Sequence, residues 1–183
     1  MNKSAENIEA GNEGARATWP PYPWAWLLIT GLIVYFDWEI KRLVSESLTL
    51  YRPVEIFSWL NMTLAHNYGA AFSFLSDAGG WQHWLFTILP GAVSLFLLVW
   101  LLRLPRAEWR SALALALILG GALGNLAGRI KFGYVVDFVD VHYSGWHFPA
   151  FNLADAAITC GVALLLLDAF LQYLANRRRS GAQ

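Results

Sequence analysis

Three carboxylates interrupt apolar stretches of this chain: Asp37, Asp137 and Asp155. A charged group at membrane depth costs about 2.5 to 3.5 kcal/mol on insertion scales, so such groups commonly face a cavity and serve a function. Asp137 lies in the apolar run from Tyr134 to Val139, and Asp155 stands at the start of the last long apolar stretch. If the chain returns to the membrane face between them, the two carboxyl groups arrive at the same depth.

Two neighbouring carboxyl groups are suited to acid and base chemistry. Both cannot ionise cheaply, so one pKa rises and a proton is shared. One group can then activate water while the other donates a proton, which is the chemistry of an aspartic protease. From the residues alone, such a pair is as often explained by a helix cap plus a structural ion pair as by catalysis. Asp140 is a competing carboxylate.

The composition requires that these carboxylates be held in a membrane protein. Of the 183 residues 57% are apolar and 14% are charged, and the mean hydropathy is +0.41. Soluble domains have about 45 to 50% apolar and about 25% charged residues. Thirteen basic residues balance thirteen acidic ones, so no net positive charge favours nucleic acid as a partner. The single Cys160 can form no internal disulfide.

Four apolar stretches are long enough to cross a bilayer, which takes roughly 20 helical residues. They cover residues 24–43, 82–102, 111–129 and 152–174. The sequence therefore predicts an all-α integral membrane protein with four transmembrane helices, in one membrane domain over residues 24–175. Residues 1–23 are polar, lack the pattern of a cleavable signal peptide and are expected to form a disordered tail. Residues 176–183 are expected to form a short basic tail.

The distribution of basic residues predicts the orientation. An even number of spans puts both termini on one side, and the side richer in Lys and Arg is the cytoplasmic one. Eight of the thirteen basic residues lie on the side of the termini: Lys3, Arg16, Arg103, Arg106, Arg110, Arg177, Arg178 and Arg179. Both termini are therefore expected in the cytoplasm, and the two longer connections, residues 48–80 and 130–151, on the periplasmic face.

The first of these connections is expected to carry a small periplasmic β-sheet. Residues 54–75 are too polar to span a membrane and are rich in β-forming residues with partial alternation. Asn67, Tyr68 and Gly69 indicate a turn, and a surface loop or amphipathic segment is expected to follow it to residue 80. The second connection, residues 130–151, is expected to be a loop that carries Asp137.

Four blocks of sequence carry a resemblance to a known family. They are residues 67–73 (NYGAAFS), 120–126 (GGALGNL), 133–138 (GYVVDF) and 148–155 (FPAFNLAD). Each block alone is ordinary membrane sequence, but the four together, in this order, are specific. From about residue 30 to residue 170 the chain resembles the lipoprotein signal peptidase, or signal peptidase II, family.

The resemblance implies a monomeric membrane aspartic endopeptidase without metal or cofactor. It matches Asp137 and Asp155 to the family's catalytic pair. Its implied partners are membrane lipid and a diacylglyceryl-modified bacterial prolipoprotein, cleaved before the lipid-bearing cysteine at the outer face of the inner membrane. The sequence agrees about metal, since it has four His and one Cys and no His-Glu-x-x-His pattern. The expected supporting residues are Asp37, Lys41, Asn67, Gly69, Asn125, Arg129, Asn152 and Ala154.

Some of these supporting residues have a second interpretation. Asp37 and Lys41 are four apart on a helix and can equally form a plain ion pair. The glycines at 120, 121 and 124 are more consistent with close helix packing than with substrate contact.

The sequence departs from the family's usual residues at four positions near the expected site: Trp38, Tyr68, Gly128 and Ala156. The family usually has an acidic residue at position 128, so Arg129 loses its expected partner. We expect Arg129 to pair with Asp137 instead, which would lower the pKa of Asp137.

Three classes of function are compatible with these residues. The peptidase is favoured because both expected catalytic residues are present. The four departures also fit a weakened relative, natural or engineered, that binds lipoprotein precursors without cutting them. A small carrier or channel would need carboxylates distributed through the bilayer, whereas these three are expected at one face.

Overall fold

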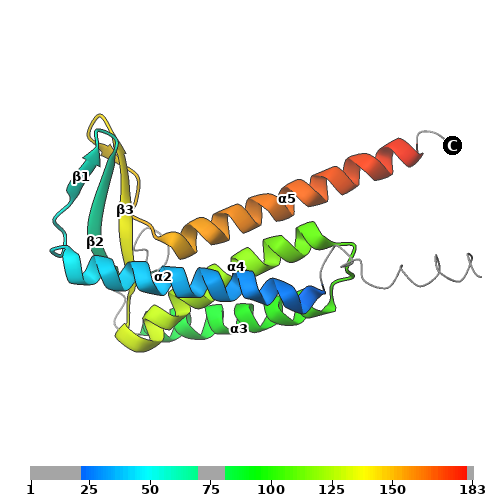
Figure 1. Ribbon diagram of the computed structural model, residues 1–183, viewed down its shortest axis with the longest axis horizontal. Coiled ribbons are helices and arrows are strands. Elements are labelled where there is room, and N and C mark those ends of the chain that lie inside the picture. Colours follow the sequence, from blue (N-terminus) through cyan, green and yellow to red (C-terminus); the bar gives the residue numbers. More distant parts are fainter. Residues whose placement is uncertain (1–21, 70–80, 181–183) are drawn as a thin grey trace, which may run out of the picture.

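The computed structural model describes residues 22–69 and 81–180, a set of helices with one sheet at the end of the bundle (Figure 1). The helices are η1 (Pro23–Trp26), α2 (Leu27–Ser47), α3 (Trp81–Arg103), α4 (Trp109–Phe132) and α5 (Leu153–Ser180). The strands are β1 (Val54–Phe57), β2 (Leu60–Asn67), β3 (Val135–Tyr143) and β4 (Trp146–His147).

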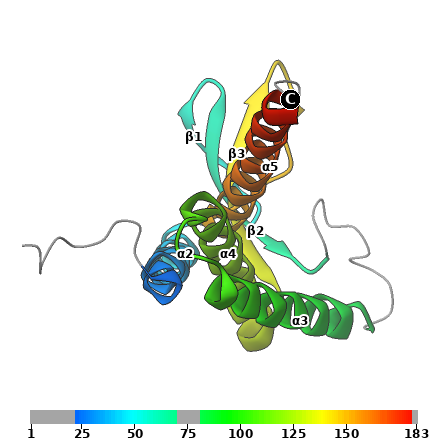
Figure 2. The ribbon, with the colours of Figure 1, turned by 90° about the vertical axis from the view of Figure 1, so that its right-hand side faces the viewer.

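The central helix is α4, which packs against α2, α3 and α5. Viewed along the bundle, these three helices lie around it (Figure 2), and α5 diverges from the bundle towards its C-terminal end (Figure 1). Close approach of α5 depends on Gly121, because a Cβ at this position would overlap the backbone oxygen of Ala154. The interpretation of this glycine as a packing residue is therefore supported.

Three helices in the described part of the chain are long and apolar enough to cross a membrane: Trp84–Arg103, Trp109–Phe132 and Leu153–Arg178. The helix α2 differs from them because the half nearest the sheet carries five charged residues, Asp37, Glu39, Lys41, Arg42 and Glu46. The four-span prediction is thus supported for three helices by length and composition.

Two apolar clusters hold the bundle and the sheet together. The larger one joins η1, α3 and α4 at the end away from the sheet and is centred on Leu101 and Leu115, both completely buried. The smaller one joins α2 to the sheet through Val44, Leu64 and Phe138. The sheet is therefore fixed to the helices by buried apolar surface as well as by the chain connections.

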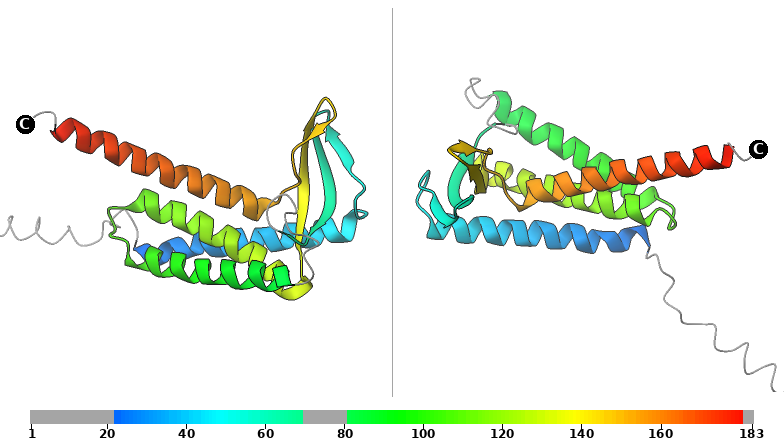
Figure 3. Two further views of the ribbon diagram at one scale, coloured as in Figure 1. Left: turned by 180° about the vertical axis from the view of Figure 1, so that it is seen from behind. Right: turned by 90° about the horizontal axis from the view of Figure 1, so that it is seen from above.

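The sheet is antiparallel, with strand order β1, β2, β3, β4, and it stands across the end of the helices (Figure 3). Its presence confirms the small sheet predicted from residues 54–75. The chain enters it from α4 through Gly133, whose φ of +82° is a left-handed helix end. In the centre of the sheet Asn61 lies opposite Asp140, and Ala65 lies opposite Asp137.

Two of the sequence-based boundaries need correction. Residues 130–151 are not a loop, because α4 continues to Phe132 and the segment then forms β3 and β4. The pairing partner of β3 is β2, roughly 70 residues earlier, so local alternation could not reveal it. The basic segment 176–183 is helical as far as Ser180.

Three predictions fall on residues that the structure does not describe: the disordered tail at 1–21, the surface loop or amphipathic segment at 70–80, and the end of the basic tail at 181–183. Of the predicted tail 1–23 only Tyr22 and Pro23 are described, and Pro23 is the first residue of η1.

Replacement of Gly121 by alanine should destabilise the fold, because the added methyl group meets the backbone of Ala154 as well as the side chain of Ile158, and the backbone cannot move aside easily. We expect a loss of about 1 to 3 kcal/mol, as for overpacking elsewhere in cores. The matched control is Gly91→Ala in α3, where the nearest atom to the added Cβ is 3.9 Å away. In detergent, the melting temperature of Gly121→Ala should be well below that of Gly91→Ala. Equal melting temperatures would contradict the packing role of Gly121.

Candidate active site

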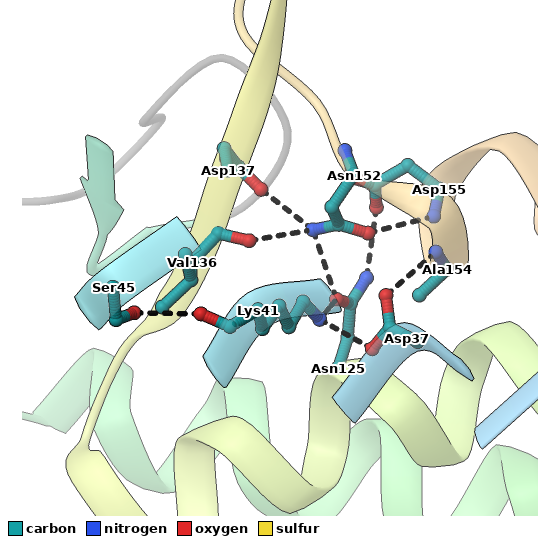
Figure 4. Close-up of polar contacts among 9 residues, drawn as sticks. All are labelled: Asp37, Lys41, Ser45, Asn125, Val136, Asp137, Asn152, Ala154 and Asp155. Carbon is teal, nitrogen blue, oxygen red and sulfur yellow. Dashed lines mark hydrogen bonds and ion pairs between the residues drawn. The ribbon is translucent and has the colours of Figure 1, made fainter. Parts of the chain in front are cut away.

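A buried asparagine, Asn152, lies at the centre of a polar network at the junction of the helices and the sheet (Figure 4). Its side-chain Nδ2 donates to Asp137 Oδ1 at 2.6 Å and to Asn125 Oδ1 at 3.2 Å. The same nitrogen lies 3.3 Å from the carbonyl oxygen of Val136. One amide thus joins α4, β3 and the start of α5.

Asp155 is oriented by the first turn of α5. Its backbone N–H donates to Asn152 Oδ1 at 3.0 Å, and its Oδ2 accepts from the backbone N–H of Asn152 at 3.2 Å. This reciprocal pair is a capping box, which fixes both side chains. The other carboxylate oxygen, Oδ1, accepts from Asn125 Nδ2 at 2.8 Å. Asp155 is therefore part of a helix cap, as one interpretation predicted, and it also lines a pocket.

Asp137 reaches the same network from the middle of β3. Its Oδ2 accepts from Asn67 Nδ2 at 3.0 Å, and its side chain is bound through Oδ1 to Asn152. Asn67 ends β2, and its Oδ1 accepts the backbone N–H of Gly69 at 3.1 Å, as expected for the predicted turn. Asn152 thus contacts Asp137 and Asp155 directly, and a third asparagine holds Asp137 from the sheet side.

The helix α2 supports this network with a buried ion pair. Lys41 Nζ lies 2.7 Å from Asp37 Oδ2 and donates to Asn125 Oδ1 at 2.8 Å. Asp37 Oδ1 accepts the backbone N–H of Ala154 at 3.0 Å. Because an ammonium group can only donate, Asn125 must turn its oxygen to Lys41 and its NH₂ to Asp155. The ion-pair interpretation of Asp37 and Lys41 is thus confirmed, and this ion pair is bonded to the network around Asn152.

Arg129 does not pair with Asp137, contrary to our expectation. Its Nη2 donates to the backbone carbonyl of Gly69 at 3.1 Å, and no ion pair of Arg129 occurs within residues 22–69 and 81–180. The expected fall of the Asp137 pKa is also wrong. Burial raises the pKa of Asp137 to about 6. The negative charge of Asp155 also raises this pKa, whereas the hydrogen bond from Asn67 lowers it.

Asp137 and Asp155 line one pocket of about 600 Å³. Its polar end also contains Asn67, Asn125 and Arg129, whereas its apolar walls are residues 148–151 and residues 158–160 of α5. Asp140 does not line this pocket, so it is not the competing carboxylate. Among the residues that the structure describes, no three His, Cys, Asp or Glu side chains are grouped as metal ligands.

Comparisons with known proteins agree with this geometry. The profile of the family described as Signal peptidase (SPase) II matches residues 29–171. The chain belongs to the signal peptidase II family. The lipoprotein signal peptidase of Acinetobacter baylyi is 53% identical over 163 residues, which cover 89% of this chain and 90% of that protein. The lipoprotein signal peptidase of Teredinibacter turnerae is 50% identical over 143 residues, 78% of this chain and 85% of that one.

Solved structures lead to the same family-level fold. A bacterial membrane enzyme determined by the in meso method at 2.3 Å resolution has a TM-score of 0.74 and 31% identity, with 83% of this chain and 90% of that chain covered. A second, determined at 1.9 Å resolution, has a TM-score of 0.69 and 30% identity, with 79% and 92% covered. This signal peptidase II family member is thus a multi-pass membrane peptidase.

The four departures from the usual residues of signal peptidase II lie at different distances from the pocket. Only Ala156 lines it. Trp38 stacks on Phe132 with 5.9 Å between ring centroids, and Trp38 and Gly128 line a separate pocket of about 220 Å³ between α2 and α4. Tyr68 is exposed and packs edge-on against Tyr134. Trp38, Tyr68 and Gly128 therefore do not line the pocket that contains the two carboxyl groups.

Sequence reasoning missed the apolar walls of the pocket. Residues 158–160 follow Asp155 by one helical turn, and the 148–155 block was noted only for its resemblance. Helical spacing from Asp155 was the available signal, since residues three and four apart share a face.

The raised pKa of Asp137 predicts how stability depends on pH. An unfolded Asp ionises near pH 3.8, and the folded Asp137 ionises near pH 6, so this group's contribution to stability is present below pH 3.8 and is lost as the pH rises to about 6. At about 1.4 kcal/mol per pKa unit, the loss is roughly 3 kcal/mol. We expect the melting temperature of the wild type relative to Asp137→Ala to be higher at pH 4 than at pH 7. A difference that stays constant or grows with pH would contradict the raised pKa.

Proposed function

We propose that this protein is an aspartic endopeptidase that removes signal peptides from diacylglyceryl-modified prolipoproteins, cutting before the lipid-bearing cysteine. The observation that carries the proposal is the pocket in which Asp137 and Asp155 are both bonded to Asn152. Membership of the signal peptidase II family supports the peptidase activity, and the relatives named lipoprotein signal peptidase support the substrate.

In this proposal Asp137 carries the shared proton and Asp155 is the carboxylate. Burial raises the pKa of Asp137 to about 6, so near neutral pH a larger fraction of Asp137 is protonated than of an Asp with the ordinary pKa of 3.8. Asp155 receives donors from Asn125 and from the N-terminal turn of α5, whose dipole also favours a negative charge. The two carboxyl groups thus have different environments, as a general acid and a general base require.

The reaction follows from these two states. Asp155 accepts a proton from the attacking water while Asp137 donates its proton to the carbonyl oxygen of the scissile bond. The resulting tetrahedral diol collapses when Asp155 protonates the leaving nitrogen and one diol hydroxyl returns its proton to Asp137. Both carboxyl groups then regain their starting states, and no further co-reactant is consumed.

The shape of the pocket supports a lipid-anchored peptide as the substrate. Its polar end holds the two carboxyl groups, and its apolar wall continues along Ile158, Thr159 and Cys160 of α5. A substrate anchored by acyl chains presents its scissile bond at a fixed depth in the membrane. This anchoring lowers the entropy that the substrate loses when the enzyme orients it. One chain supplies both carboxyl groups, and we propose that the monomer is the working form.

Replacement of either carboxyl group should abolish cleavage. Asp137→Asn and Asp155→Asn each keep the side-chain shape but remove the acid or base, which should lower the rate roughly 10²- to 10⁴-fold. The matched control is Asp168→Asn, a buried carboxylate towards the other end of α5 that accepts from Ser111 Oγ at 2.9 Å. The measurement is the conversion of a purified diacylglyceryl-modified precursor in detergent, followed by gel mobility. If Asp137→Asn or Asp155→Asn cleaved the precursor at the wild-type rate, the assignment of that residue as the acid or base would be wrong.

A relative that binds precursors without cutting them is the second candidate function. The small side chain of Ala156 in the pocket wall and the missing carboxylate at Gly128 favour it. If this second candidate is correct, the wild-type protein should bind the precursor in the same assay but release no cleaved signal peptide. Release of a signal peptide by the purified wild type would exclude it.

We further propose that α2 is the fourth span and that the site faces the periplasm. Each charge in the polar half of α2 has a partner: Lys41 pairs with the buried Asp37, and Arg42 lies 2.8 Å from Glu39 and 3.0 Å from Glu46. Pairing reduces the cost of placing these charges at the end of a span. The excess of basic residues at the other end of the bundle supports cytoplasmic termini in a bacterial inner membrane.

Cysteine labelling tests this orientation. In a Cys160→Ala background, Ser144→Cys places a thiol on the exposed turn between β3 and β4, and Gln183→Cys places one at the C-terminus. We expect a membrane-impermeant maleimide to label the first variant in cells whose outer membrane alone has been permeabilised. The second should react only after the inner membrane is opened, and the reverse pattern would overturn the orientation.

A further inference from the structure

A second polar network lies in the sheet, away from the pocket. Asp140 follows Asp137 by three positions in β3, but unlike Asp137 it does not line the pocket. Asp140 Oδ2 accepts from Asn61 Nδ2 at 2.9 Å, and Asp140 Oδ1 lies 2.8 Å from His147 Nδ1. His142 Nε2 lies 3.2 Å from Asn61 Oδ1. The network therefore joins β2, β3 and β4.

The chemistry of the partners fixes the direction of each hydrogen bond. Asn61 turns its NH₂ to Asp140, so its Oδ1 accepts and His142 donates through Nε2. An ionised Asp140 only accepts, so His147 donates through Nδ1. Burial alone would raise the pKa of Asp140, but the donors from Asn61 and His147 outweigh it and lower this pKa. Asp140 is thus a charged anchor for His147.

His147 stands directly before the segment that forms one wall of the pocket, Phe148–Phe151, here termed the strap. The strap is joined to β3 at both ends: the N–H of Phe148 donates to the oxygen of Val141 at 2.8 Å, and that of Phe151 to the oxygen of Val139 at 3.0 Å. Beyond Phe151 the chain enters Asn152 and the fixed cap of α5. At the other end, β4 has only two residues, so the side chain of His147 adds the anchor that a short strand lacks.

We propose that Asp140 and His147 are positioning residues that hold the strap as the wall against which the substrate lies. The inference rests on the proposed function, because it assigns the strap a contact with that substrate. The four strap residues line the pocket that contains Asp137 and Asp155, but neither Asp140 nor His147 lines it. Their effect on the substrate therefore passes through the strap.

This placement makes a specific kinetic prediction. A wall contacts the substrate equally before and during the reaction, so loosening the wall raises KM and leaves kcat unchanged. The network around Asn152 uses other atoms and should keep the two carboxyl groups in place. A general loss of structure would instead lower kcat through the loss of active protein.

The decisive variants differ in one donor. His147→Leu removes the donor to Asp140 and keeps an apolar side chain of similar bulk, whereas His147→Asn keeps an NH₂ near the position of Nδ1. We expect KM to rise about tenfold in His147→Leu, as for the loss of one hydrogen bond to a charged group, with kcat within about twofold of the wild type. His147→Asn should return KM close to the wild-type value. The control Tyr143→Leu, on the same hairpin with a residue that is 79% exposed, should change neither constant.

Hydrogen exchange gives a readout that does not depend on activity. In His147→Leu the backbone amides of Phe148 and Phe151 should exchange faster than in the wild type, while the amide of Asp155 should keep its protection. If His147→Leu yields too little folded protein, Asp140→Asn removes the charge and should give a smaller change in the same direction. Unchanged KM and unchanged exchange would overturn the inference, as would a fall in kcat at constant KM. Failure of the wild type to cut any precursor would instead overturn the proposed function, and the exchange experiment would still decide whether His147 holds the strap.

Discussion

Burying a carboxylate removes it from water, and this cost must be met by donors from the protein. Asp37 and Asp137 are buried, and Asp155 is partly buried beside them. In the described part of the network, Lys41 is the one cation in direct contact with a carboxylate. The remaining donors are neutral amides. An asparagine side chain both accepts and donates, so Asn125 can accept from Lys41 and donate to Asp155. Burial raises the pKa of Asp137, and the amide donors from Asn67 and Asn152 offset this rise only in part.

This constraint determines which elements must meet. Asn67 comes from β2, Asp137 from β3, Asn125 from α4 and Asn152 from the cap of α5. The sheet therefore belongs to the site, since without β2 and β3 neither Asn67 nor Asp137 would reach it. Close packing of α5 on α4 at Gly121 brings the capped end of α5 beside Asn125. A helix bundle alone would supply only Asp37, Lys41, Asn125 and Asp155.

The sequence predicted the parts of this arrangement that depend on composition and local pattern. Three apolar helices, the small sheet and the turn at Asn67 all have local signals, and the resemblance identified the family. Pairing of β3 with β2 has no local signal, because the two strands are separated by two helices along the chain. Arg129 illustrates a second limit. A missing carboxylate at position 128 suggested a new ion pair, but a guanidinium can also donate to a backbone carbonyl, and the carbonyl of Gly69 lies within reach.

The two carboxylates of β3 show how one strand can hold side chains of the same type in different states. Asp137 faces the pocket and has neutral donors around it, so burial dominates and its pKa is raised. Asp140 lies outside the pocket, and although burial would raise its pKa, the donors from Asn61 and His147 outweigh burial and lower it. These two environments are three residues apart along β3. Within one strand, the carboxyl group proposed for chemistry therefore has a raised pKa, whereas Asp140 has a lowered pKa and anchors the sheet. The strap connects both, since it lies between His147, the partner of Asp140, and Asn152, the asparagine that holds Asp137.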